Sequence, residues 1–313
     1  MPSSQASATI DMEELRPWIG RSETMTDVLH PVPLASLSAT LDTAPFALRI
    51  GQPLPPLWHW AYFLLQAPAH ALGPDGHPRR GGFLPPVALP RRMWAGSRFT
   101  FEQPLCVGDT VQRISTIESI AHKQGRSGNL VFVTVRHAYR VMGNADDVAT
   151  AADALTEWHD IVYRGEPQAA GSASDTALPV ALPGAQHGPC EHQADGSFCQ
   201  QWRADPVLLF RYSALTFNGH RIHYDRSYAT QTEGYPGLVV HGPLLATLLV
   251  ELVRTQWPQH QLAAYHFRAL HPVFDIHPFS LHAKQADGHT VELWVQDWQG
   301  RCAMEATATL HPA

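Results

Sequence analysis

The sequence predicts an α+β fold in which two antiparallel sheets are each wrapped round a helix, the helix of the N-terminal half being degenerate. Three observations lead to this prediction: a break rich in Gly, Ala, Pro and Ser near the middle of the chain, strand-like segments on both sides of it, and one strongly apolar helical segment. The chain has 313 residues, 44% of them hydrophobic, which is enough for one large domain or two of ordinary size.

The break covers residues 165–189, GEPQAAGSASDTALPVALPGAQHGP, which have no sustained periodicity and are predicted to be a linker. It separates an N-terminal domain, residues 1–164, from a C-terminal domain, residues 190–313. Both parts are of domain size, and we expect each to form its own sheet.

Four strands are expected in each half because β-branched and aromatic residues recur between turn signals. The expected strands are residues 98–105, 110–123, 129–142 and 155–164 in the first half, and 262–270, 279–287, 290–298 and 302–310 in the second. Pro104 and Pro272 each follow an aromatic strand at the same point of this plan, which indicates that the halves are copies of one design.

The segment Pro243–Trp257, PLLATLLVELVRTQW, is predicted to be a helix with Pro in its first turn and Gly242 just before it. Its first three turns are apolar on nearly every face, so the helix must be enclosed. One enclosed helix followed by four antiparallel strands is the hot-dog arrangement. Residues 54–68, LPPLWHWAYFLLQAP, are its short counterpart in the first half and suit a remodelled helix or a pocket wall.

Composition excludes several classes of protein. The formal net charge of −6 argues against non-specific nucleic-acid binding. No secretory signal or 18-residue apolar span is found, so we expect a cytoplasmic protein that does not cross a membrane. The cysteines are too few and too scattered for a disulfide scaffold; they are Cys106, Cys190, Cys199 and Cys302.

Nineteen histidines raise the question of a metal site. His187, Cys190, His192 and Cys199 lie close in sequence, but their spacing matches no paired-ligand pattern. We therefore expect a surface loop there and no metal.

A polar segment, residues 211–229 (RYSALTFNGHRIHYDRSYA), leads through EGYPGLVVHG to the start of the apolar helix. Adding water to an enoyl thioester needs a base for the water and donors for the thioester oxygen. Histidine suits the first task, since its ordinary pKa is about 6.5. The N–H groups at a helix N-terminus suit the second, where Gly242 can donate and Pro243 cannot.

These residues resemble the MaoC-like hydratases and dehydratases of the hot-dog superfamily, whose motif Ser-Gly-Asp-x-Asn-Pro-x-His-x-Asp precedes a His-Gly pair. The family histidine falls on His223 and the oxyanion-binding glycine on Gly242, after His241. The family's aspartate is Asn218 here and its asparagine is His220. Asn218 cannot act as a base, although it can hold a water or orient the substrate.

The wider likeness, over most of residues 45–310, is to the branch of mesaconyl-CoA hydratases and mitochondrial 3-hydroxyacyl-thioester dehydratases. GGFLPPVALPRRMWAG (81–96) and KQGRSGNLVFVTVRHAYR (123–140) also carry it. The resemblance implies a degenerate N-terminal hot dog that helps bind acyl-CoA and a C-terminal hot dog that holds the catalytic groups. The fold expected is thus a double hot-dog.

The catalytic residues expected are His223, Asn218 and Gly242. His220 is expected to support them, Asp225 to orient a neighbour, and His241 to pack at the helix end. Arg79-Arg80 and Arg91-Arg92 could hold CoA phosphates or remain solvated, and Trp58, Trp60 and Trp94 suit a core or pocket wall. The residues expected to border the substrate are Arg221, Tyr224, His241, Arg91, Arg92 and Trp94.

The expected reaction is reversible hydration of a branched dicarboxylic enoyl-CoA, of the type mesaconyl-CoA to citramalyl-CoA. A 3-hydroxyacyl-thioester dehydratase of fatty-acid synthesis is the rival in the same class. A thioesterase is less attractive because Asn218 replaces a carboxylate, and a non-catalytic acyl-CoA binder is the fourth alternative. The expected partner is an acyl-CoA, with no other cofactor, no nucleic acid and no membrane. The chain could form a homo-oligomer such as a dimer.

Overall fold

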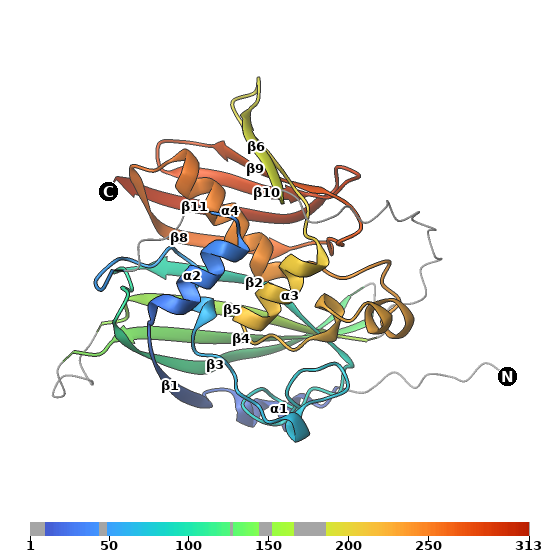
Figure 1. Ribbon diagram of the computed structural model, residues 1–313. Helices are drawn as coiled ribbons and strands as arrows, with labels where there is room; N and C mark the ends of the chain where they lie inside the picture. Colours follow the sequence, from blue (N-terminus) through green and yellow to red (C-terminus); the bar gives the residue numbers. More distant parts are fainter. Residues whose placement is uncertain (1–9, 44–48, 126–127, 144–151, 166–185, 313) are drawn as a thin grey trace.

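A computed structural model describes residues 10–43, 49–125, 128–143, 152–165 and 186–312. All of its strands join one antiparallel sheet of eleven strands in the order β1-β3-β4-β5-β2-β8-β11-β10-β9-β7-β6 (Figure 1). The strands are β1 (Ser22–Val28), β2 (Arg91–Phe101), β3 (Thr110–Gly125), β4 (Gly128–Val141), β5 (Leu155–Arg164), β6 (His187–His192), β7 (Phe198–Trp202), β8 (His260–Ala269), β9 (Phe279–Gln285), β10 (Thr290–Gln296) and β11 (Cys302–Pro312).

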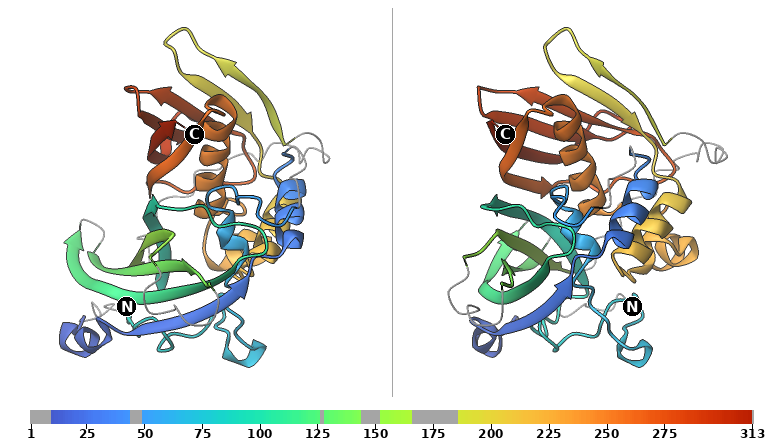
Figure 2. Two further views of the ribbon diagram at one scale, coloured as in Figure 1. Left: turned by 90° about the vertical axis from the view of Figure 1, so that its left-hand side faces the viewer. Right: turned by 60° about the vertical axis from the view of Figure 1, so that its left-hand side comes forward.

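The two halves meet edge to edge where β2 pairs with β8. Gly96 makes this junction possible, because a Cβ atom there would lie 2.3 Å from the carbonyl oxygen of Phe267. The sheet curves on both sides of the junction (Figure 2). Each half is a curved sheet that contains the four strands predicted for it, which confirms the double hot-dog prediction, and the two sheets are continuous at their shared edge.

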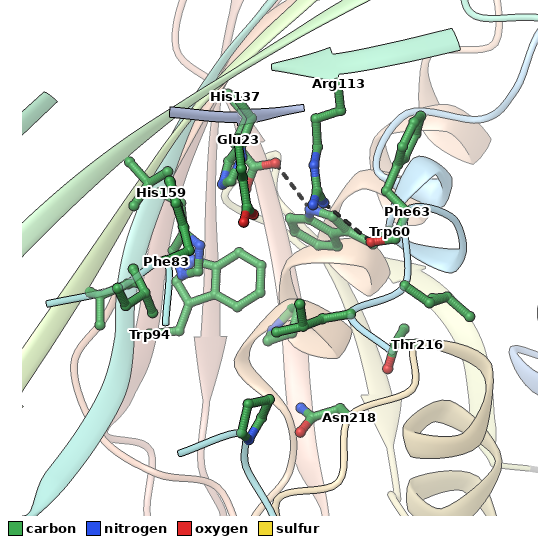
Figure 3. A pocket seen from close by; sticks show the side chains of 18 of the residues that line it. Glu23, Trp60, Phe63, Phe83, Trp94, Arg113, His137, His159, Thr216 and Asn218 are labelled. Carbon is green, nitrogen blue, oxygen red and sulfur yellow. Dashed lines mark hydrogen bonds between the residues drawn. The ribbon is translucent and has the colours of Figure 1, made fainter. Parts of the chain in front are cut away.

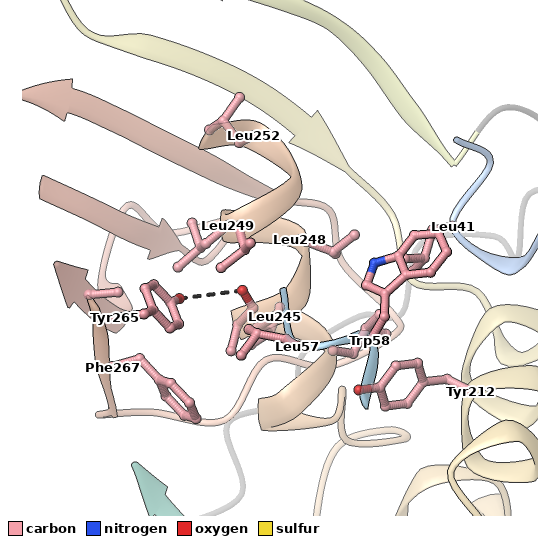
Figure 4. Packing of buried hydrophobic residues seen from close by; sticks show 14 of the residues in the cluster. Leu41, Leu57, Trp58, Tyr212, Leu245, Leu248, Leu249, Leu252, Tyr265 and Phe267 are labelled. Atoms are coloured by element: carbon pink, nitrogen blue, oxygen red, sulfur yellow. Dashed lines mark hydrogen bonds between the residues drawn. The ribbon is translucent and has the colours of Figure 1, made fainter. Parts of the chain in front are cut away.

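Helix α4 (Gly242–Gln256) lies inside the curve of the C-terminal half, as predicted. Every residue from Leu244 to Val253 is buried. Leu245, Leu248 and Leu249 are in one cluster with Tyr265 and the sheet (Figure 4). The helix is therefore enclosed, as its apolar residues on nearly every face predict.

The N-terminal half has no such helix within the described residues. Residues 54–68 form only the short 3₁₀ turn η2 (Trp58–Ala61). Trp58 packs into the cluster around α4 and donates a hydrogen bond to Glu251 Oε1 at 2.8 Å. Residues 54–68 of the N-terminal half therefore contact helix α4 of the C-terminal half through Trp58.

All eight predicted strands are confirmed, with ends within a few residues except at β2, which begins seven residues earlier than expected. The prediction of a surface loop around Cys190 is wrong. β6 and β7 form a hairpin there, and β7 pairs with β9 of the sheet. Most of the predicted linker lies outside the described residues, and β6 begins at His187, within its predicted range.

The remaining helices lie mainly on one side of the sheet, where α2 and α3 are neighbours (Figure 1). They are α1 (Met12–Leu15), η1 (Arg16–Trp18), α2 (Pro31–Thr40), η3 (Ala69–Ala71), α3 (Pro206–Leu215), η4 (Arg221–His223) and the π-helix η5 (Tyr228–Thr232). Among the described residues, no helix combines the length and the apolarity that a bilayer crossing requires.

Candidate active site

The polar segment begins where α3 ends. Phe217 has a φ of 51°, an unusual backbone conformation that turns the chain sharply. The N–H of Asn218 then donates to the carbonyl of Ser213 at 2.8 Å, and its side-chain Oδ1 accepts from the N–H of His220 at 3.0 Å. The turn places Asn218 on the wall of a cavity.

His223 ends the turn η4 and is buried. Its Nδ1 lies 2.7 Å from the carbonyl oxygen of Val239. Because a carbonyl can only accept, Nδ1 must carry the proton, which leaves the lone pair on Nε2. Burial lowers the pKa of His223 to about 4. The ring is therefore a neutral imidazole at neutral pH, with Nε2 in the form that a base requires.

His241 connects His223 to the start of α4. The two rings are stacked with their centroids 3.8 Å apart. His241 Nε2 shares a hydrogen bond of 2.8 Å with Ser213 Oγ, and burial holds its pKa well below the ordinary value. Since His241 is the residue before Gly242, the stack fixes His223 beside the helix N-terminus.

Gly242 is the first residue of α4. The first N–H groups of a helix have no acceptor within the helix, so they can bind a ligand oxygen. A Cβ atom at Gly242 would meet no heavy atom within 4 Å. The space beside this residue is therefore open, and Pro243 next to it lines the cavity.

A loop of the N-terminal half docks against the polar segment through two glycines. A Cβ atom at Gly76 would lie 1.9 Å from the carbonyl oxygen of Gly219, and one at Gly219 would lie 2.6 Å from that of Gly76. The N–H of Arg221 donates to the carbonyl of Asp75 at 2.9 Å. This contact brings Asp75 and His77 next to the polar segment of the C-terminal half, although neither residue was expected at the site.

Asp75 and His77 extend the row of histidines. His77 Nδ1 donates to Asp75 Oδ2 at 3.2 Å, and the ring of His77 lies 4.2 Å from that of His220. The ring of His220 in turn meets that of His223 edge-on, with centroids 5.5 Å apart. Ligand atoms of Asp75, His77 and His220 lie within 4.8 Å of one another. This donor set could bind a divalent cation, although the charge of Arg92, which acts on both histidines, opposes that.

The cavity has a volume of about 410 Å³ and lies in the N-terminal half, over β2–β5 (Figure 3). Trp60, Phe63, Phe83 and Trp94 form much of its apolar wall, and Asn218 closes one end. Apolar walls with a few placed polar groups are typical of a site for a small organic ligand.

Glu157 is the most deeply buried charge on the cavity wall. Burial alone would raise its pKa, but the hydrogen bond and charge of His59 and the charge of His137 outweigh burial and lower the pKa to about 2. Trp60 Nε1 and Ser97 Oγ each donate to it at 3.2 Å. Glu157 is thus an ionised, fully bonded group that fixes the wall.

Among the residues expected to border the substrate, Arg92 and Trp94 line the described cavity. Arg91 is ion-paired with Glu233, and Arg221 with Asp225. Tyr224 donates to the carbonyl of Gly219 at 2.8 Å, and His241 is fully buried in its stack. These four residues do not line the cavity as it is described.

The fold is that of a double hot-dog protein. Solved structures agree on the fold: a double hot-dog protein of Mycobacterium tuberculosis is 13% identical, covers 94% of this chain and 96% of its own, and superposes with a TM-score of 0.55. At this identity the likeness concerns the fold alone.

Sequence comparison extends this to the family. Residues 57–275 match the family model of hydroxyacyl-thioester dehydratase type 2. The chain is 44% identical to the mesaconyl-C(4)-CoA hydratase of Chloroflexus aurantiacus, covering 94% of this chain and 96% of that protein. It is 26% identical to the mitochondrial hydroxyacyl-thioester dehydratase type 2 of Schizosaccharomyces pombe, with 87% and 91% covered. The chain belongs to the hydroxyacyl-thioester dehydratase type 2 family and is a hydro-lyase of the hydratase/dehydratase type.

Proposed function

We propose that the protein reversibly adds water to the double bond of a short dicarboxylic enoyl-CoA, with mesaconyl-C4-CoA as the first substrate to test. The relative of 44% identity bears that activity in its name. The observation that carries the proposal is the arrangement of His223, His241 and Gly242. The neutral imidazole of His223 is stacked on His241, and the next residue, Gly242, is the first of helix α4.

In the proposed mechanism, His223 Nε2 takes a proton from water as the water oxygen bonds to the β-carbon. The electron pair of the double bond moves toward the thioester carbonyl, whose oxygen becomes an enolate oxygen. The N–H of Gly242 and the positive end of α4 stabilise that oxygen. The imidazolium then returns its proton to the α-carbon, so a single residue supplies both proton transfers. The low pKa of His223 makes its imidazolium a strong acid for this second step.

Asn218 is proposed to hold the attacking water or to orient the acyl group. Its Oδ1 accepts a hydrogen bond from the N–H of His220, and its side chain lies on the wall of the cavity that is proposed to receive the acyl group. The cavity of the N-terminal half is proposed to receive the acyl group. Free cysteines at all four positions agree with a reducing compartment, and we propose that the enzyme acts in the cytoplasm.

The test is a spectroscopic assay with mesaconyl-C4-CoA, crotonyl-CoA and a long-chain enoyl-CoA, read as loss of enoyl absorbance and as release of free CoA. We expect loss of absorbance without CoA release, fastest with the dicarboxylic ester. Preference for the long chain would favour a dehydratase of fatty-acid synthesis. Release of CoA would favour a thioesterase, and no reaction with any ester would contradict the proposal.

A further inference from the structure

We propose that Arg92 binds the free carboxylate of the acyl group and so selects dicarboxylic substrates, an inference that rests on the proposed function. In mesaconyl-C4-CoA this carboxylate is attached to the β-carbon, the atom that water attacks. A cation that recognises it must therefore lie on the wall of the acyl cavity and near the reacting groups. Arg92 lies on that wall, together with Asn218 and Pro243 from the candidate catalytic region.

Four arginines line the cavity, and three of them are bound to backbone carbonyls. These bonds run from Arg79 to Leu72, from Arg80 to Val87, Leu89 and Pro90, and from Arg113 to Phe63. Arg92 differs from them, since no hydrogen bond from its guanidinium to a backbone carbonyl is found among the described residues, and no carboxylate there lies within ion-pair distance of it. Its polar neighbour is the hydroxyl of Tyr163, opposite it in the β2–β5 ladder; burial raises the pKa of this tyrosine and the charge of Arg92 opposes the rise.

Arg92 also shares its cavity with Asn218 of the polar segment and with Pro243 in the first turn of α4. Burial is the main cause that lowers the pKa of His77 and of His220, and the charge of Arg92 lowers both further. His220 is the neighbour of His223 in the row of rings. The guanidinium therefore lies on the same cavity wall as residues of the segment and of the helix end that are proposed to carry the reaction.

The position of Arg92 on β2 explains why it differs from Arg91. Successive side chains of a strand point to opposite faces, so residues 92 and 94 share the cavity face while residue 91 points away. Trp94 does line the cavity, whereas Arg91 pairs with Glu233 at 3.1 Å on the other side. Only one of two adjacent arginines is thus presented to a ligand.

Two carboxylates already line the cavity, those of Glu157 and Glu23. Glu157 accepts hydrogen bonds from Trp60 and Ser97, and burial raises the pKa of Glu23. A guanidinium can bind a substrate carboxylate through two parallel hydrogen bonds. It would also reduce the repulsion between that carboxylate and the electron-rich oxygen of the attacking water, so both KM and kcat should depend on it.

The experiment compares Arg92→Gln, Arg92→Lys and the matched control Arg98→Gln with mesaconyl-C4-CoA and crotonyl-CoA, which lacks the second carboxylate. Arg98 is on the same strand, exposed and away from the cavity. For Arg92→Gln we expect the ratio of kcat/KM between the dicarboxylic and the monocarboxylic ester to fall about 100-fold, the size expected from losing a charged bidentate contact. Arg92→Lys should keep part of the preference, and Arg98→Gln should keep all of it.

An unchanged ratio in Arg92→Gln, or equal losses with both esters, would overturn the proposal, since equal losses indicate a structural role. Hydration of crotonyl-CoA but not of mesaconyl-C4-CoA by the unaltered protein would also overturn it while leaving the reaction class intact. If the unaltered protein hydrates neither ester, the proposed function fails and the role of Arg92 fails with it.

Discussion

The two halves of the molecule share one backbone plan. After β2, the N–H groups of Glu102 and Gln103 both donate to the carbonyl of Ala154. After β8, the N–H groups of Leu270 and His271 both donate to the carbonyl of Ala303. The repeat indicated by Pro104 and Pro272 is therefore real at the level of individual hydrogen bonds.

The halves differ in what fills the curve of the sheet. In the C-terminal half α4 fills it with leucine and valine side chains, and Gly242 in the first turn of that helix has open space beside it. In the N-terminal half a single 3₁₀ turn replaces the helix, and a cavity of about 410 Å³ remains. Loss of one helix thus provides space for a ligand, while the retained helix provides the dipole, and we propose that recognition and chemistry are divided accordingly.

The largest effect is expected from His223→Ala, which removes the proposed base from the C-terminal half. General acid–base catalysis contributes roughly 100- to 10,000-fold in rate, and kcat should fall by that amount. Binding of a saturated acyl-CoA, measured by calorimetry, should change little because Gly242 and the helix end are proposed to hold the thioester. Full activity in this variant would end the case for the site.

Gly76→Ala tests the contact between the halves. Its φ of +86° disfavours a side chain, and the new Cβ would displace the loop from Gly219. We expect about a tenfold or greater loss of kcat/KM and a destabilisation of about 1–3 kcal/mol. Gly20→Ala is the matched control, with a φ of +85° and no atom near the added Cβ, and it should lose stability without losing activity. Equal activities in the two variants would show that docking of this loop is not needed.

Asn218→Asp tests the departure from the family motif. A new carboxylate beside the substrate would be partly desolvated and would repel the developing enolate, so we expect a several-fold loss of activity. A gain measured in the same absorbance assay would show instead that a two-residue mechanism is latent in the fold.

The pH dependence separates His223 from an ordinary histidine. Burial lowers its pKa to about 4, so the base form persists below the ordinary pKa of about 6.5 and is lost only as the pH falls through about 4. The kcat/KM at pH 5.5 should therefore be within about twofold of that at pH 7. An acidic limb centred near 6.5 would contradict this account of the site.

The smallest effect is expected from removal of metal ions. The proposed base is an imidazole and the proposed oxyanion donor is a backbone N–H, so dialysis against a strong chelator should leave the rate unchanged. A large loss that a divalent cation restores would assign a role to the cluster of Asp75, His77 and His220.

The sequence predicts most of the fold because the signals for it are local. Alternating apolar residues and turn glycines mark the eight strands, and the all-round apolar surface of α4 marks the enclosed helix. The strand β1, SETMTDV, was missed because it is a polar edge strand. The hairpin of β6 and β7 was missed because Gly188 and Pro189 interrupt the first of these strands.

The candidate site can be predicted where local motifs mark its residues. His223 and Asn218 belong to one motif and Gly242 to the His-Gly pair that follows it, whereas Asp75 and His77 reach the site through a contact between Gly76 and Gly219 that no local pattern encodes. The difference between Arg91 and Arg92 could have been found, since strand alternation places only one of them on the face that carries Trp94.

We propose that the N-terminal half binds the acyl group and the C-terminal half supplies the catalytic groups. A crystal structure of the protein with a bound 3-hydroxyacyl-CoA product tests this most directly. The account predicts the β-hydroxyl within hydrogen-bond distance of His223 Nε2, the thioester oxygen on the N–H of Gly242, and the acyl group in the cavity over β2–β5. An acyl group placed elsewhere, with His223 and Gly242 free of contact, would contradict it.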